Sequence, residues 1–272
     1  MKALITGASS GIGKEMAIYL SELGCDLILV ARDKEKLEEL RDSLKTKVQI
    51  VVIDLANEKR IKDLYMLTKN EDIDILINNA GFGLFGDYEH VDLLTELNMI
   101  DVNVKAVHIL TRMYLKDFAK KDKGYILNVA SSAGLLKGGP LMSCYYATKA
   151  YIVSFTEALY EELRRNKSHV KVSLLCPGPV KTNFNKVANV NFNIKQLDAK
   201  YVARYAINNL LRGNKLLIVP GFSIRLGVFL TRFLPVKSFN IFDNCEEYSI
   251  FWSVIKKYGL LIISLSNLSF II

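Results

Sequence analysis

Short apolar runs of strand length recur along this chain, and they limit its possible folds more than any other feature. They are separated by amphipathic segments such as residues 34–44, where apolar residues recur every three or four positions. Strands that are apolar throughout are typical of a parallel sheet with helices on both faces. The sequence therefore predicts an α/β protein with a doubly wound parallel sheet. The expected strands are residues 2–6, 26–31, 48–53, 74–78, 125–130, 170–175 and 215–220.

The composition fits one globular domain. The chain has 272 residues, of which 50% are hydrophobic, with 16 Gly and 5 Pro. These values exclude disordered, collagen-like and small disulfide-bonded proteins. The four cysteines share no close spacing, and the three histidines, His90, His108 and His169, have no ligand-like neighbours in the sequence. We therefore expect neither a redox cysteine pair nor a metal site.

The charge of the chain is unevenly distributed. The net charge is +8, but residues 163–242 hold fourteen Lys or Arg and one acid. Such a basic segment attracts anionic ligands or lipid headgroups, or it forms a solvated face without a partner. No nucleic-acid-binding motif accompanies it, so no nucleic-acid partner is expected. A glycine-rich turn that begins at Gly7 leaves no room for a signal peptide, which favours a cytoplasmic protein.

This glycine-rich turn follows the first expected strand. Residues 6–13, TGASSGIG, have the spacing G-x3-G-x-G, and an amphipathic segment comes directly after them. Gly7 permits a tight turn, Gly11 leaves space for a pyrophosphate, and Gly13 allows the helix to pack closely on the strand. The helix N-terminus would offer N–H groups and a positive dipole end to the phosphates. A glycine cluster alone is weak evidence, but its place between a strand and a helix predicts dinucleotide binding.

Four further motifs follow this turn in the sequence. They are Asn78-Asn79-Ala80-Gly81, Ser132, Tyr145-x-x-x-Lys149 and Pro177-Gly178. Their order and spacing resemble those of the classical short-chain dehydrogenase/reductase family, and within it the NADP-preferring bacterial type. The resemblance implies one Rossmann-type domain of three α/β/α layers at residues 1–220, followed by a C-terminal extension at 221–272. It also implies a homodimer or homotetramer that forms through helices at 100–121 and 143–166.

The resemblance implies a nicotinamide cofactor, and the end of the second strand favours NADP over NAD. Ala31 stands where NAD-binding relatives carry Asp, and Arg32 follows it. A guanidinium can pair with the 2′-phosphate of NADP, although Arg32 can also be an ordinary surface charge. Asp33 is expected to be a helix N-cap rather than a ribose ligand. For residues 78–81 a purely structural turn is the alternative to cofactor binding. The implied cofactor-binding residues are Gly7, Ser9, Ser10, Gly11, Ile12, Gly13, Arg32, Asp54, Leu55, Asn79, Ala80, Gly81, Tyr145, Lys149, Pro177, Gly178, Val180 and Thr182.

The candidate catalytic residues are centred on a tyrosine and a lysine. Tyr145 and Lys149 are four positions apart, so on a helix their side chains project from one face. A free tyrosine has a pKa of about 10, and a neighbouring ammonium would stabilise its phenolate. By the resemblance, Tyr145 donates a proton to a carbonyl oxygen, and Lys149 also holds the nicotinamide ribose. Ser132 would hydrogen-bond the same oxygen, and Asn103 would hold a water in a proton relay to Lys149.

Two neighbouring residues compete with these assignments. Tyr146 also faces Lys149 roughly, but it breaks the Y-x-x-x-K spacing. Ser131 is adjacent to Ser132, but strand alternation would turn its side chain to the other side of the sheet. We therefore predict Tyr145 as the proton donor and Ser132 as the hydrogen-bonding serine.

The region after the sixth strand is expected to cover the substrate. Residues 184–195 are rich in Asn with spaced apolar positions, which is typical of a mobile lid. The residues that suggest an apolar pocket are Leu135, Leu136, Leu141, Met142 and Phe184.

The C-terminal extension is apolar with a few basic residues. Residues 222–234 place Arg225 and Arg232 on one face of an otherwise apolar helix. This helix either packs over the pocket or a subunit interface, or lies on a membrane surface. Residues 258–272 carry no charge, but this stretch is shorter than the roughly 20 residues that span a bilayer. We expect it to pack against the protein or a partner subunit, with peripheral membrane attachment as the alternative.

Together these features predict an NADPH-dependent carbonyl reductase that transfers a hydride to a ketone or aldehyde. The apolar pocket and the basic surface favour a hydrophobic substrate, such as an acyl thioester. A non-catalytic NADP-binding sensor on the same fold is the alternative. The complete set of Asn103, Ser132, Tyr145 and Lys149 argues against it, because a sensor needs no proton relay.

Overall fold

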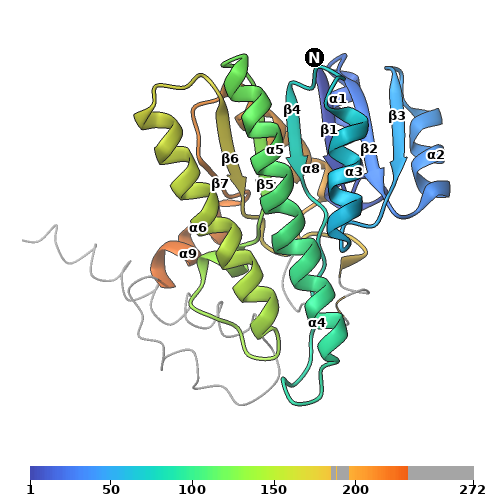
Figure 1. The fold of residues 1–272 in the computed structure, drawn as a ribbon. Coiled ribbons are helices and arrows are strands. Elements are labelled where there is room, and N and C mark those ends of the chain that lie inside the picture. Colours follow the sequence, from blue (N-terminus) through green and yellow to red (C-terminus); the bar gives the residue numbers. More distant parts are fainter. Residues whose placement is uncertain (185–187, 189–195, 232–272) are drawn as a thin grey trace, which may run out of the picture.

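The structure is a computed structural model that describes residues 1–184, 188 and 196–231. Its centre is a sheet of seven parallel strands in the order β3-β2-β1-β4-β5-β6-β7 (Figure 1). This arrangement confirms the predicted doubly wound α/β fold in a single domain. The strands are β1 (Lys2–Thr6), β2 (Asp26–Ala31), β3 (Val48–Val52), β4 (Ile75–Asn78), β5 (Tyr125–Val129), β6 (Lys171–Leu175) and β7 (Leu217–Ile218).

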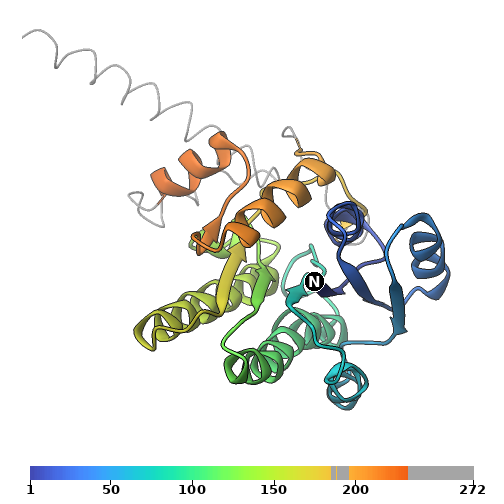
Figure 2. The ribbon, with the colours of Figure 1, turned by 90° about the horizontal axis from the view of Figure 1, so that it is seen from above.

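Helices cover both faces of the sheet, as Figure 2 shows from above. One face carries α1 (Gly11–Glu22), α2 (Lys34–Ser43) and α8 (Ala199–Arg212). The other face carries α3 (Glu58–Thr68), α5 (Val107–Lys120) and α6 (Ser143–Arg165). The helix α4 (Leu93–Ile100) and a π-helical segment, η1 (Asp101–Ala106), lead without a break into α5.

The apolar strands are explained by burial on both faces. Ile5 and Leu29 belong to the core under α1, α2 and α8, whereas their neighbours Leu4 and Ile28 belong to the core under α3 and α5. Successive side chains of a strand point to opposite faces, so both positions must be apolar. Burial of each such side chain contributes about 1.5–3 kcal/mol to stability.

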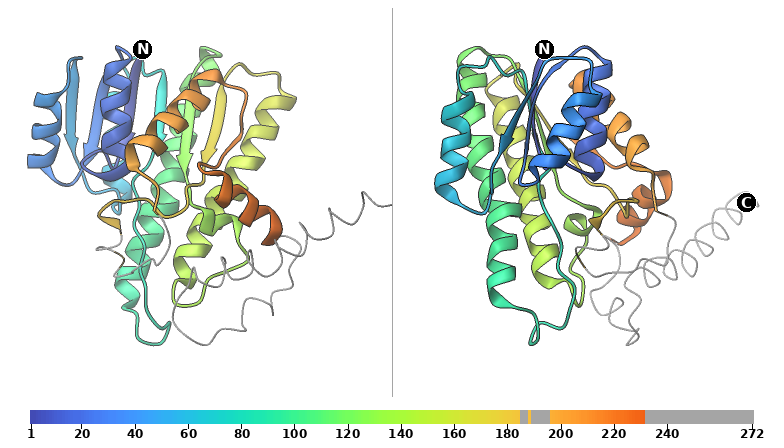
Figure 3. Two further views of the ribbon diagram at one scale, coloured as in Figure 1. Left: turned by 180° about the vertical axis from the view of Figure 1, so that it is seen from behind. Right: turned by 90° about the vertical axis from the view of Figure 1, so that its right-hand side faces the viewer.

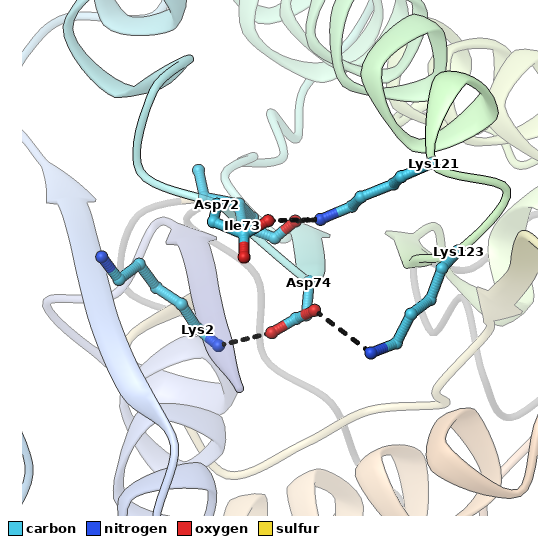
Figure 4. A network of polar contacts seen from close by, with 6 residues as sticks. All are labelled: Lys2, Asp72, Ile73, Asp74, Lys121 and Lys123. Carbon is cyan, nitrogen blue, oxygen red and sulfur yellow. Dashed lines mark hydrogen bonds and ion pairs between the residues drawn. The ribbon is translucent and has the colours of Figure 1, made fainter.

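The sheet has an amino edge, where its parallel strands begin, and a carboxyl edge, where they finish, and the two differ in their chemistry. At the amino edge, the backbone N–H of Lys2 donates to Asp74 Oδ2 at 3.0 Å, and Lys123 Nζ lies 3.9 Å from Asp74 Oδ1 (Figure 4). Lys121 Nζ donates to Asp72 Oδ1 at 2.9 Å and to the carbonyl oxygen of Ile73 at 2.8 Å. These contacts fasten the starts of β1, β4 and β5 to one another. The carboxyl edge, where the strand order reverses between β1 and β4, is left for ligand binding.

A last described helix, α9 (Phe222–Thr231), packs at the carboxyl end of the sheet on the side of α8 (Figure 3). Ile224 and Val228 are buried in one cluster with Ile152 of α6 and Leu174 of β6. The first residues of the predicted extension therefore pack on the sheet domain. Arg225 is exposed, whereas Arg232, the uncharged stretch 258–272 and most of the predicted lid lie outside the described residues. None of the helices in the described part of the chain is long and apolar enough to cross a bilayer.

Candidate active site

A cavity of about 610 Å³ opens at the carboxyl edge of the sheet. Its wall is built from the glycine-rich turn after β1, the ends of β2, β3, β4 and β5, the start of α6 and the loop after β6. The predicted site residues in this wall are Gly7, Ser9, Ser10, Gly11, Ile12, Arg32, Asp54, Leu55, Asn79, Ala80, Gly81, Tyr145, Lys149, Pro177, Gly178, Val180 and Thr182. Residues far apart in the sequence are thus brought to one cavity because parallel strands end at the same edge.

The glycine-rich turn requires glycine at two cavity positions. Gly7 and Gly11 have φ angles of +66° and +56°, in the left-handed region that side chains disfavour. A Cβ on Gly7 would lie 2.8 Å from the Cα of Ala80, and one on Gly11 would lie 3.1 Å from Cγ2 of Thr182. The turn therefore fits against two other loops of the wall only without side chains.

Gly13 has a packing role rather than a place in the cavity wall. It is not among the residues that line the cavity, and its predicted contact with the cofactor stays a prediction. A Cβ there would lie 2.4 Å from the carbonyl oxygen of Gly7 and 2.4 Å from Asn79 Nδ2. The first turn of α1 needs this close approach, as the expected helix–strand packing required.

The Asn-Ala-Gly turn after β4 is fastened to the glycine-rich turn. Asn79 Nδ2 donates to the carbonyl oxygens of Thr6 at 3.0 Å and of Gly7 at 3.1 Å. The backbone N–H groups of Asn79 and Ala80 both donate to Thr6 Oγ1 at 3.0 Å. The turn has a structural role and lines the cavity as well, so the two alternatives considered for it are compatible.

The other end of the cavity lies where β2 and β3 end. Arg32 is exposed at this edge, and Asp54 and Leu55 form the opposite wall. Asp33 is the N-cap of α2 and accepts a hydrogen bond from the N–H of Lys36 at 3.1 Å, as predicted. Asp54 Oδ1 accepts one from the N–H of Ala56 at 3.0 Å, so this carboxylate also forms a local turn.

Tyr145 and Lys149 lie one helical turn apart on the buried face of α6. Lys149 Nζ is 5.8 Å from the ring centre of Tyr145 and donates to the carbonyl oxygen of Val129 at 3.1 Å. Burial disfavours the charged amine and lowers the pKa of Lys149 to about 8. An amine with this pKa exchanges a proton near neutral pH, unlike an exposed lysine. The ring of Phe184 packs on the ring of Tyr145 at 5.5 Å between centres.

Asn103 is fully buried in the π-helical segment and lies outside the cavity wall. Its Nδ2 donates to the carbonyl oxygen of Phe82 at 2.8 Å, and its Oδ1 accepts from the N–H of Phe82 at 3.0 Å. A Cβ on Gly81 would lie 2.9 Å from Asn103 Oδ1 and 3.3 Å from Lys149 Nζ. Asn103 therefore positions the backbone beside the lysine, while its predicted contact with a water stays a prediction. A π-helical turn at this position is typical of functional sites.

Ser131 and Ser132 lie next to each other just after β5, and the assignment of Ser132 as the hydrogen-bonding serine stays a prediction. Ser131 lines the cavity, whereas Ser132 does not. The alternation argument fails because β5 ends at Val129, two residues before Ser131. Ser131 is the N-cap of a short 3-10 helix, η2 (Ser132–Leu135), and its Oγ accepts from the N–H of Ala133 at 3.1 Å. Both serines therefore lie beyond the end of β5, and strand alternation does not decide between their side chains.

The apolar part of the wall differs partly from the prediction. Met142 and Phe184 line the cavity as expected, whereas Leu135, Leu136 and Leu141 do not. The wall also includes Phe82, Val102, Tyr146 and Lys36, of which only Tyr146 was considered from the sequence, as a rival to Tyr145. Phe82 directly follows the Asn-Ala-Gly turn, and that adjacency was the signal that could have identified it.

Comparisons with known proteins agree with this fold and site. The family model for short chain dehydrogenase matches residues 1–191. An uncharacterized short-chain type dehydrogenase/reductase from Sinorhizobium fredii is 38% identical over 188 residues, covering 68% of this chain and 72% of the relative. A 3-oxoacyl-(acyl-carrier-protein) reductase from Rickettsia prowazekii is 35% identical over 190 residues, covering 69% of this chain and 76% of the relative. The chain therefore belongs to the short-chain dehydrogenase/reductase family.

Solved structures lead to the same family. A short-chain dehydrogenase from Sphingobium yanoikuyae in complex with NADPH matches with a TM-score of 0.76 and 26% identity, covering 86% of this chain and 96% of that chain. A family member from Burkholderia phymatum in complex with NAD matches with a TM-score of 0.76 and 28% identity, covering 84% and 92%. The protein therefore has the fold of this oxidoreductase family, with a site for a nicotinamide cofactor.

The residues of the cavity fit such a cofactor. Gly7 and Gly11 leave a cradle free of Cβ atoms, and Ser10 is the N-cap of α1, whose first N–H groups would donate to a phosphate bound at this position. The same cavity is lined by Arg32 at one end and by Tyr145 and Lys149 at the other.

Proposed function

We propose that the protein is an NADPH-dependent carbonyl reductase that converts a ketone or aldehyde to an alcohol. The observation that carries this proposal is the pairing of Tyr145 with the buried Lys149 in the wall of a cavity that also holds the glycine-rich turn. When bound, NADPH supplies the hydride. The protein supplies the proton and the groups that hold the carbonyl oxygen.

Tyr145 donates the proton to the carbonyl oxygen in this proposal. The ammonium of Lys149 stabilises the phenolate that remains, because the opposite charge lies close by in a site of low polarity. Ser132 hydrogen-bonds the carbonyl oxygen in this proposal, and the adjacent Ser131 lines the cavity. Gly81 lacks a side chain and so leaves room for Lys149, and Asn103 holds the adjacent backbone of Phe82.

The preference for NADP rests on the end of β2. Arg32 lies in the cavity wall and is exposed, so its guanidinium is accessible to a 2′-phosphate. Asp33 is engaged as the N-cap of α2 and so competes poorly as an acceptor for the ribose hydroxyls that favour NAD.

The substrate in this proposal is hydrophobic and resembles an acyl thioester. Phe82, Met142, Tyr146 and Phe184 form an apolar wall around Tyr145. The relative from Rickettsia prowazekii is named as a 3-oxoacyl reductase, which supports an acyl-type substrate.

The remaining parts of the proposal concern assembly and location. The protein is cytoplasmic and forms a homodimer or homotetramer. Phe222 on the outer face of α9 is 73% exposed, which supports peripheral membrane contact through residues 222–272 as an alternative to a purely soluble state. Sedimentation of the full chain with and without lipid vesicles tests the oligomeric state and the membrane contact.

The test of the function is NADPH oxidation by the purified protein over a panel of carbonyl compounds, from small aldehydes to 3-oxoacyl thioesters, with NADH in parallel. We expect turnover with NADPH that rises with apolar chain length. Tyr145→Phe should lower turnover about 100- to 10,000-fold and leave NADPH binding within about twofold, because general acid catalysis contributes about 10²–10⁴-fold. Tyr146→Phe is the matched control and should keep turnover. NADPH binding without turnover in the wild type would favour a nucleotide sensor instead.

A further inference from the structure

The end of β2 holds a second cation besides Arg32. Lys36, on the first turn of α2, lines the same cavity as Arg32, Asp33 and Asp54. Lys36 does not stand out in the sequence, because it lies four positions after Arg32 within a segment that is expected to form a surface helix.

Lys36 contacts Asp33, the acidic residue that directly follows Arg32. Asp33 accepts a hydrogen bond from the N–H of Lys36 at 3.1 Å, and its carboxylate also forms an ion pair with Lys36 Nζ. One side chain of Asp33 thus satisfies the helix N-terminus and the ammonium together. The carboxylate could turn toward a ribose only by giving up both contacts.

Lys36 occupies a position where a helix normally disfavours a cation. Asp33 is the N-cap, so Lys36 stands at the third helical position, where a Glu would complete a capping box and suit the positive end of the helix dipole. A residue that works against local helix preference is expected at functional sites. The adjacent Asp33 reduces the cost of this placement.

The ammonium of Lys36 keeps donors for a ligand. An ammonium has three N–H donors, and the ion pair with Asp33 uses one direction of them. The side chain of Lys36 is 55% exposed at the cavity edge, so the remaining donors are accessible to an anion bound beside Arg32. Lysine binds phosphate as a point charge, whereas arginine binds it through its planar fork, so the two residues can share one phosphate.

We propose that Lys36 is a second specificity-determining residue for NADP, and that it binds the 2′-phosphate together with Arg32 while its ion pair with Asp33 keeps that carboxylate away from the ribose. The inference rests on the proposed NADP preference and goes beyond it by assigning a residue on α2. Specificity is then set by the pair of cations rather than by Arg32 alone.

The test measures the binding of adenosine 2′,5′-bisphosphate, which carries the 2′-phosphate, and of AMP, which lacks it, by calorimetry on the full chain. Lys36→Met removes the charge and keeps the length of the side chain. We expect it to weaken the binding of the bisphosphate at least about tenfold, since a hydrogen bond to a charged phosphate is lost. The binding of AMP should not weaken, because the carboxylate of Asp33 is then released toward the ribose.

Lys34→Met is the matched control. Lys34 stands on the same helical turn, pairs with Glu38 at 3.7 Å and does not line the cavity. It should change the binding of either nucleotide less than twofold. Circular dichroism checks the fold, which we expect to persist because both variants remove a cation from the first turn of a helix.

Two outcomes separate the inference from the proposed function. If the wild type binds the bisphosphate no better than AMP, the proposed NADP preference fails. If the wild type prefers the bisphosphate, Arg32→Met loses that preference and Lys36→Met behaves as Lys34→Met, then only the role of Lys36 is overturned.

Discussion

At the scale of single residues, the site depends on what burial does to one amine and on where one strand ends. Lys149 is enclosed by α6, Gly81 and the backbone of Val129, and this enclosure lowers the pKa of its amine. Ser131 lines the cavity, and the backbone leaves the sheet two residues before it. Neither effect can be read from residue types alone.

The choice between the serines can be tested directly. Ser132→Ala should lower turnover about 100-fold, since the loss of one hydrogen bond to a developing oxyanion costs about 10²–10³ in rate. Ser131→Ala removes a hydroxyl that is the N-cap of η2 and should change turnover less than threefold. Steady-state kinetics with NADPH would contradict the assignment if the two variants changed places.

The lowered pKa of Lys149 predicts how the stability of the protein depends on pH. The amine has a pKa of about 8 in the folded chain and 10.5 as its ordinary value. Between these values the unfolded chain binds more protons than the folded chain, so the free energy of unfolding rises with pH from this cause, by at most about 1.4 kcal/mol per pH unit.

The variant Lys149→Met lacks this titration. The stability of the wild type relative to Lys149→Met should therefore increase between pH 8 and 10, whatever the constant cost of losing the hydrogen bond to Val129. Urea unfolding of both proteins without cofactor at several pH values measures this difference. A difference that stays constant with pH would mean that burial does not lower the pKa of the Lys149 amine.

At the scale of elements, α9 connects the C-terminal region to the cavity. Ile224 is 6% exposed, and a Cβ on Gly178 would lie 2.7 Å from its Cδ1. Gly178 lines the cavity, so this helix supports the loop that faces the cofactor site. The sequence indicated an apolar helix here but not which of its faces is buried.

Truncating the side chain of Ile224 should affect both the stability of the protein and the binding of its cofactor. Ile224→Ala removes buried atoms and should lower the free energy of unfolding by about 2 kcal/mol or more. It should also raise KM for NADPH, because the loop at Gly178 loses its support. Phe222→Ala, at an exposed position of the same helix, is the control and should leave both unchanged. Thermal unfolding and cofactor titration of the two variants provide the measurements.

At the scale of the whole molecule, the parallel sheet separates stability from chemistry. Lys2, Asp74 and Lys123 join the starts of three strands at the amino edge. The carboxyl edge collects the glycine-rich turn, the Asn-Ala-Gly turn and the end of β5 around one cavity. Parallel strands force this polarity, since all of their carboxyl ends face the same way.

The sequence by itself determined the fold class and most of the site. Strands buried on both faces must be apolar throughout, so their pattern predicted the doubly wound sheet. The glycine-rich turn and the Tyr145–Lys149 spacing are local in the chain, and the fold brings both to one cavity. Only the tertiary structure decided that Gly13 and Asn103 position other groups, and that Lys36 lines the same cavity as Arg32. These outcomes depend on where strands end and on contacts between distant segments, and the order of residue types along the chain does not specify either.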